Sequence, residues 1–189
     1  MLELLILVFT SATAANAVYA MAYGAESLDG LTADSRKATL CGAVLMLVTV
    51  ITESIAWCAV TFIADIGHTL MIVVPLLAFG VTYGVAFIIK KLNLRMYRMI
   101  EGYIALIASN TAVVGIVYGV TGKGLGLSES VIHAACSAFG VMAAYTVFAV
   151  VREGIPESKQ PHALRGVPTV LITAGLIAMV FYGFFEMRI

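Results

Sequence analysis

The sequence predicts an all-α membrane protein, and three observations lead to this fold class. Of the 189 residues, 61% are hydrophobic and 12% are charged, about half the charged fraction of an ordinary globular domain. The mean hydropathy is +1.02. The apolar stretches are long and unbroken, without the alternation that marks a membrane-spanning β-strand. We therefore expect one helical membrane domain over residues 1–189, in contact with the lipid bilayer.

Six segments are long enough to cross a hydrocarbon core of about 30 Å as helices. The first follows the N-terminus without the basic region of a signal peptide, so we expect it to be retained. An even number of spans places both termini on one side of the membrane. The predicted spans are Leu2–Tyr23, Ala38–Ala64, Thr69–Ile89, Ile100–Val120, Ser128–Val151 and Val167–Phe185.

Basic residues are distributed unevenly between the two sides. The loops after spans one, three and five carry nine of them, which are Arg36, Lys37, Lys90, Lys91, Arg95, Arg98, Arg152, Lys159 and Arg165, whereas the other side has only Lys123 and Arg188. Because cytoplasmic loops are enriched in Lys and Arg, the side with nine basic residues is expected to be cytoplasmic. Both termini are then expected on the outer side of the cytoplasmic (inner) membrane. The loops are too short for a soluble catalytic domain, so we expect any cytoplasmic chemistry to come from partners and the chain not to catalyse alone. The basic residues are not gathered for nucleic acid.

An internal repeat relates the two halves of the chain. The stretch "AANAVYAMAYG" in span one matches "ASNTAVVGIVYG" in span four, and "ATLCGAV" matches "HAACSAF". The offset is 94 residues between Asn16 and Asn110 and 95 between Cys41 and Cys136. Three spans per half make the repeat inverted, with halves at about 1–95 and 96–189. We expect broken or half helices at spans one and four, although ordinary helix packing is the alternative for these small and polar residues.

Three polar residues inside the spans are candidates for an ion path: Asn16, Glu53 and Asn110. A carboxylate near the middle of span two is costly in a bilayer. Two interpretations of Glu53 stay open, namely a proton or sodium relay group and a neutral acid hydrogen-bonded to a neighbouring helix. The three cysteines are widely spaced and form no CxxC or His/Cys cluster, so the sequence assigns no metal site.

The chain resembles the RnfA/NqrE family of membrane subunits. Its "SNTAVVG" is similar to the family's "TNCAVLG", and "PHALRGVPTVLITAGLIAMVFYGF" is similar to the family's C-terminal segment. The resemblance implies an integral subunit of an Rnf- or Nqr-type complex that couples electron transfer to Na⁺ or H⁺ translocation. It also implies a homologous six-span sister subunit of opposite orientation, and partners that carry flavin and iron–sulfur groups.

The resemblance further implies a [2Fe-2S] cluster shared with the sister subunit, to which each subunit gives two cysteines. Where the family has "GLCPF", this chain has "GAESL", which sets Glu26 or a neighbour at the cysteine position, and Thr111 stands at the cysteine of "NCA". Thiolates are the usual ligands of such clusters. We expect the usual four-thiolate binding to be lost. Three explanations stay open: electrons follow a different route through the complex, the chain has diverged and keeps only the scaffold of the ion path, or the sister's cysteines hold a cluster together with oxygen ligands from this chain.

Two other functions remain open at this point. A free-standing secondary transporter of ions or solutes would suit an inverted repeat with Asn16, Asn110 and Glu53 near the membrane midplane. A purely structural assembly subunit would tolerate replacement of all these residues without loss of turnover.

Overall fold

Helices form all the regular elements in the part of the chain that the structure describes. The structure, a computed structural model, describes residues 6, 16–32, 34–62, 69–155, 161 and 164–186. No strand occurs within these residues, which confirms the all-α class. The elements that matter below are α2 (Ala17–Met21), η1 (Ala25–Ser27), α3 (Leu28–Leu31), α4 (Ser35–Phe62), α5 (Leu70–Leu92), α6 (Leu94–Ile100), η2 (Glu101–Tyr103), α7 (Ile104–Ala108), α8 (Thr111–Thr121), α9 (Leu127–Glu153) and α10 (Val167–Glu186).

Three helices, α4, α5 and α9, are long and apolar enough to cross a membrane, and they match the second, third and fifth predicted spans. In the region of the fourth span, Leu94–Ala108 and Thr111–Thr121 meet at an angle of 55°. The prediction that this span is broken is therefore confirmed. Helix α10 lies at the sixth predicted span. Most of the first span lies outside the described residues, so the count of six and a break in span one stay predictions.

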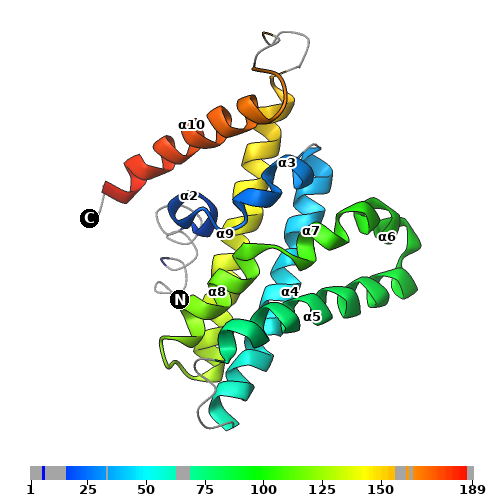
Figure 1. Cartoon of the computed structure of the whole chain (residues 1–189), viewed down its shortest axis with the longest axis vertical. Coiled ribbons are helices and arrows are strands. Elements are labelled where there is room, and N and C mark those ends of the chain that lie inside the picture. The colour runs from blue at the N-terminus through cyan, green and yellow to red at the C-terminus, as the bar shows by residue number, and fades with distance from the viewer. Residues whose placement is uncertain are drawn as a thin grey trace.

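The long helices α4 and α9 pack side by side in antiparallel directions (Figure 1). Near one end, the backbone N–H of Ser35 donates to Glu153 Oε1 at 2.7 Å. Further along, Gly42 faces Met142 so closely that a Cβ on the glycine would lie 2.7 Å from Met142 Cγ. The missing side chain thus allows the two backbones to approach closely, as small residues do in membrane helix pairs.

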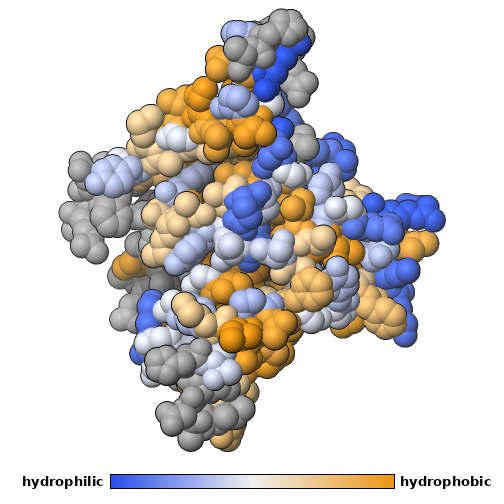
Figure 2. Space-filling view, in the orientation of Figure 1, coloured by the Kyte–Doolittle hydropathy of each residue, from blue (hydrophilic) through white to orange (hydrophobic). Residues whose placement is uncertain are grey.

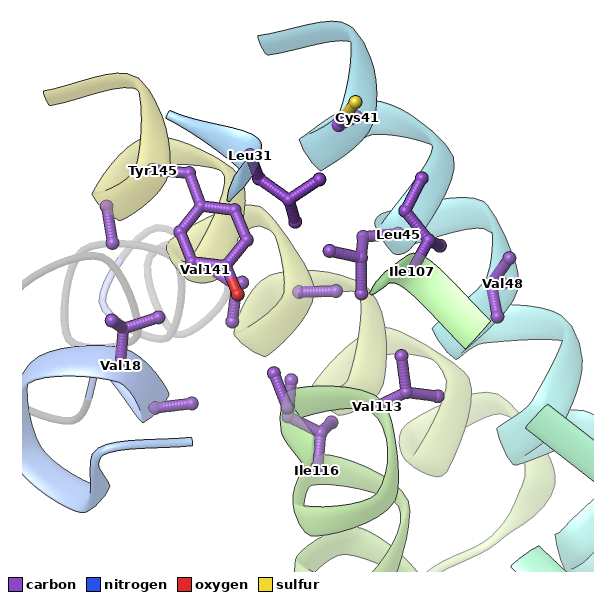
Figure 3. Close-up of a cluster of buried hydrophobic side chains, with 14 of the residues drawn as sticks. Val18, Leu31, Cys41, Leu45, Val48, Ile107, Val113, Ile116, Val141 and Tyr145 are labelled. Atoms are coloured by element: carbon purple, nitrogen blue, oxygen red, sulfur yellow. The ribbon is translucent and has the colours of Figure 1, made fainter. Parts of the chain in front are cut away.

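A single large apolar cluster joins α4 and α9 to the shorter helices around them. Figure 3 shows four of its side chains, Leu31, Leu45, Val113 and Tyr145, which come from α3, α4, α8 and α9. Tyr145 is completely buried. The cluster holds the broken segment around α8 against the long helices, and this contact fixes the position of the polar residues described below.

Apolar and basic side chains lie on different parts of the outer surface. Helices α5 and α10 expose many large apolar side chains, as expected for surfaces that meet lipid or other subunits. Hydrophilic side chains gather over α6 and the adjoining end of α5, on the right of Figure 2. The basic residues of this region are Lys90, Lys91, Arg95 and Arg98.

Candidate functional site

The two repeated asparagines, Asn16 and Asn110, have the same local structural role. Asn16 has φ −63° and ψ 123°, and its side chain accepts a hydrogen bond from Val18 N at 3.0 Å. Asn110 has φ −70° and ψ 120°, and its side chain accepts from Ala112 N at 2.8 Å. Each is therefore the N-cap of a short helix, α2 or α8. The polar residues in the middle of span four are needed because a helix ends and another begins there.

The amide nitrogen of Asn110 belongs to a buried polar network. It donates to Ser27 Oγ at 2.6 Å and to Tyr145 Oη at 2.9 Å. Both hydroxyls in turn donate to the carbonyl oxygen of Gly24, at 3.0 and 2.9 Å. A flipped amide would turn its NH₂ group toward Ala112 N–H, so the network itself assigns the amide orientation. Every donor in this network has an acceptor.

Glu26 and Thr111, the two residues that the family resemblance sets at cysteine positions, lie in direct contact. The carboxylate of Glu26 accepts from Thr111 N and from Thr111 Oγ1, both at 2.8 Å. The threonine hydroxyl also accepts from Gly24 N at 2.8 Å. Thr111 is the first residue of α8, where a negative charge is stabilised by the free N–H groups and the helix dipole. Both side chains are exposed in the isolated chain.

This pair does not fit an iron–sulfur cluster. It offers carboxylate and hydroxyl oxygens where thiolates are the usual ligands, and these oxygens already bond to one another. The free cysteines lie elsewhere, with Cys41 and Cys136 buried in α4 and α9, and Cys58 exposed. Among the described residues, no group of three or more His, Cys, Asp or Glu side chains could hold a metal ion.

Glu53 lies apart from these residues. Its side chain is completely buried in α4, and its carboxylate oxygens are 3.4 and 3.3 Å from Thr121 Oγ1 at the end of α8. Thr111 and Thr121 are separated by ten residues of one helix, which is about 15 Å along its axis. The structure thus brings Asn110, Glu26 and Thr111 together, while Asn16 caps the neighbouring α2 and Glu53 occupies a second place.

Sequence reasoning missed several members of these two groups. Gly24, Ser27 and Tyr145 complete the network around Asn110, and Thr121 is the partner of Glu53. A tyrosine within the apolar fifth span was an available signal, because a buried tyrosine hydroxyl usually has a hydrogen-bond partner. Which partner it has depends on packing between helices and could not be obtained from spacing.

Comparison with known proteins places the whole chain in one family. The family model described as "Rnf-Nqr subunit, membrane protein" matches residues 4–188. A subunit of the ion-translocating oxidoreductase complex of Azoarcus sp. strain BH72 is 28% identical over 187 residues, which is 97% of each chain. A subunit of the Na⁺-translocating ferredoxin:NAD⁺ oxidoreductase complex of Acetobacterium woodii is 32% identical over 125 residues, 66% of this chain and 65% of that one.

A shorter but closer match comes from Buchnera aphidicola subsp. Baizongia pistaciae. Its ion-translocating oxidoreductase complex has a subunit that is 37% identical over 97 residues, about half of either chain. The relatives thus agree with the family model, which covers all but a few terminal residues. This chain belongs to the Rnf-Nqr family of membrane-protein subunits.

Proposed function

We propose that this chain is a membrane subunit of an Rnf-type complex, in which electron transfer between partner subunits is coupled to the movement of Na⁺ or H⁺ across the membrane. The observation that carries the proposal is the family match over residues 4–188, together with relatives whose names state ion translocation by an oxidoreductase complex. The short connections of the described chain supply no catalytic domain, so its role is exercised within the complex.

We place the chain in the cytoplasmic membrane as two inverted halves, with both termini on the outer side. The nine-to-two distribution of basic residues supports this orientation. The matched caps at Asn16 and Asn110 support the repeat, since both asparagines begin a short helix with nearly the same backbone angles. A sister subunit of the same fold would cover the exposed Glu26 and Thr111, and subunits with flavin and iron–sulfur groups would supply the electrons.

The same proposal includes the loss of four-thiolate cluster binding at this position. Glu26 and Thr111 satisfy each other's polar groups and stabilise the start of α8. The chain therefore contributes a helix scaffold at this place, and electrons pass through groups held by other subunits.

The test is purification of the tagged chain from its native membranes, followed by identification of the attached proteins. A six-span sister subunit and flavin-bearing subunits are expected to co-purify. A chain that purifies alone and carries out sodium-dependent solute transport would instead favour the secondary transporter.

Iron, acid-labile sulfide and the paramagnetic-resonance spectrum of the same complex test the cluster. We expect a Glu26→Gln, Thr111→Val double variant to retain the wild-type iron content and spectrum. The matched variant is Glu26→Cys, Thr111→Cys, which restores both thiols and is expected to add a cluster signal if the sister subunit offers its own pair. Loss of an existing signal in the Gln/Val variant would contradict the proposal, because it would mean ligation through oxygen.

A further inference from the structure

Glu53 is a buried carboxylate for which the described part of the chain offers no basic partner. Its side chain is fully buried, and the ion pair seen among the described residues joins Arg152 to Asp29 rather than to Glu53. A charged carboxylate taken out of water without a counter-charge is strongly unfavourable. In a membrane span such a residue usually faces a binding site or an ion route. Since no described side chain supplies the counter-charge, a proton or a bound cation is left to neutralise it.

The geometry at Thr121 favours a cation. The threonine hydroxyl is 3.4 and 3.3 Å from the two carboxylate oxygens, whereas a direct O–H···O⁻ hydrogen bond is about 2.5–2.7 Å long. Oxygen ligands lie about 2.3–2.6 Å from Ca²⁺, so two ligands at a right angle are about 3.3–3.7 Å apart. Sodium has nearly the same ionic radius, and the observed separations fall in that range.

Three buried hydroxyls in this part of the bundle have no hydrogen-bond partner among the described residues: Thr52 Oγ1, Tyr118 Oη and Ser130 Oγ. Hydroxyls elsewhere in the helices behave differently. Thr49 and Thr82, for example, donate to the carbonyl oxygen four residues earlier at 2.8 and 2.7 Å. Thr52 and Ser130 are completely buried, but neither hydroxyl makes this bond among the described residues. Unpartnered buried oxygens are rare in native proteins and call for a specific explanation.

The positions of these hydroxyls place them at the same level of the bundle as Glu53. Thr52 precedes Glu53 in α4, and Tyr118 lies one helical turn before Thr121 in α8. Ser130 comes from α9, which runs antiparallel to α4. Because Gly42 packs against Met142, the residues twelve positions further along the pair, Ser54 and Ser130, lie at one level. This is the end of the bundle where α4 and α8 end and α9 begins (Figure 1).

We propose that Glu53, with the hydroxyl oxygens of Thr52, Tyr118, Thr121 and Ser130, forms a binding site for a dehydrated monovalent cation of the size of Na⁺. Carboxylate and hydroxyl oxygens are hard ligands, suited to a hard cation. One negative charge among neutral oxygens is balanced by a single positive charge, so a divalent cation would leave an excess buried charge. The binding site is independent of the proposed function; only the part it plays in ion translocation rests on that proposal.

The test measures Na⁺ binding to the purified complex by equilibrium dialysis with radioactive sodium, at fixed pH and with choline chloride holding the ionic strength constant. Wild type is expected to bind one saturable ion at this site, in preference to K⁺. Glu53→Gln is expected to weaken binding by roughly tenfold or more, because the carboxylate supplies the only charge opposite the cation. Thr121→Val and Ser130→Ala are expected to weaken it by smaller factors. These two variants keep the test valid if Glu53→Gln does not assemble.

The matched control is Glu129→Gln, an exposed acid one residue before Ser130, which is expected to leave binding unchanged. Na⁺ binding that is equal in wild type, Glu53→Gln and Thr121→Val would overturn the site, and so would wild type that binds no sodium. In those cases Glu53 is a protonated acid and the hydroxyls bind water. Should the chain purify without partners yet bind Na⁺ in a Glu53-dependent way, the site stands and the proposed membership of a complex fails.

Discussion

Two groups of buried polar residues, both in contact with α8, are built on opposite principles. At its N-terminal end, Asn110, Ser27 and Tyr145 converge on the carbonyl oxygen of Gly24, and each donor meets an acceptor. At its C-terminal end, the described residues give Glu53 one distant hydroxyl partner and give three buried hydroxyls at the same level none. A closed network fixes a chain in one arrangement, whereas an open set of oxygens is ready for a ligand. The first group should therefore respond to mutation through stability, and the second through binding.

Gly24 should be the position most sensitive to substitution in the closed network. Its φ is +78°, and a Cβ there would lie 2.3 Å from Tyr145 Oη and 3.0 Å from Asn110 Oδ1. We expect Gly24→Ala to lower the free energy of unfolding by about 3 kcal/mol, from left-handed backbone strain and overpacking together. Equilibrium unfolding of the complex in mixed micelles measures the change.

A second glycine separates those two causes. Gly124 also has a positive φ, +63°, but a Cβ on it would meet nothing within 4 Å. Gly124→Ala should therefore cost only the backbone strain, about 1–2 kcal/mol. Equal losses at the two positions would mean that the close approach of Tyr145 to Gly24 is not maintained in the protein.

Replacement of Asn110 tests the network from its centre. Asn110→Ala removes the cap of α8 and leaves two buried hydroxyls without their donor. We expect a loss of about 2–3 kcal/mol in the free energy of unfolding. Asn93→Ala is the matched control, because Asn93 caps α6 from an exposed position and should cost only about 1 kcal/mol. A loss no greater than that of the control would mean that Asn110 stabilises the protein only as a helix cap and that its hydrogen bonds to the two buried hydroxyls add nothing.

Thr111→Val should have a smaller effect, because the Glu26–Thr111 pair is exposed at the edge of the closed network. The variant removes the hydroxyl that bonds Glu26 and Gly24 but keeps the backbone N–H that also bonds Glu26. We expect about 1 kcal/mol of destabilisation. The same unfolding measurement on the assembled complex checks it. If a sister subunit buries this pair, the loss should be larger in the complex than in the isolated chain.

Much of the closed network's framework could be predicted from the sequence. Asn110 in an apolar segment indicated a helix break, because a buried helix end needs a capping side chain, and the repeat pointed to Asn16 as its counterpart. The contact between Glu26 and Thr111 followed only from the family resemblance, which assigned both to one site. Composition and periodicity do not bring together residues 85 positions apart.

The partners from other helices could not be predicted. Tyr145 reaches Gly24 only because α9 packs beside η1 and α8, a result of tertiary contacts that no local pattern encodes. The cost of a carboxylate in span two singled out Glu53, but Thr121 and Ser130 looked like ordinary residues at helix ends. Thr121 reaches Glu53 through the packing of α8 on α4, and the level of Ser130 follows from the antiparallel register of α4 and α9 at Gly42.

The smallest expected effect on stability, at Glu53, separates the two groups of polar residues most clearly. In sodium-free buffer, Glu53→Gln removes a buried acid that has no strong hydrogen bond to lose, so the free energy of unfolding should change by no more than about 0.5 kcal/mol. In sodium, wild type should become more stable as the ion concentration rises above its dissociation constant, while the variant should not. Asn110→Ala should show its full loss in both buffers. A Glu53→Gln variant that is strongly destabilised without sodium would make Glu53 part of a closed network like the other, and the distinction between the two ends of α8 would fail.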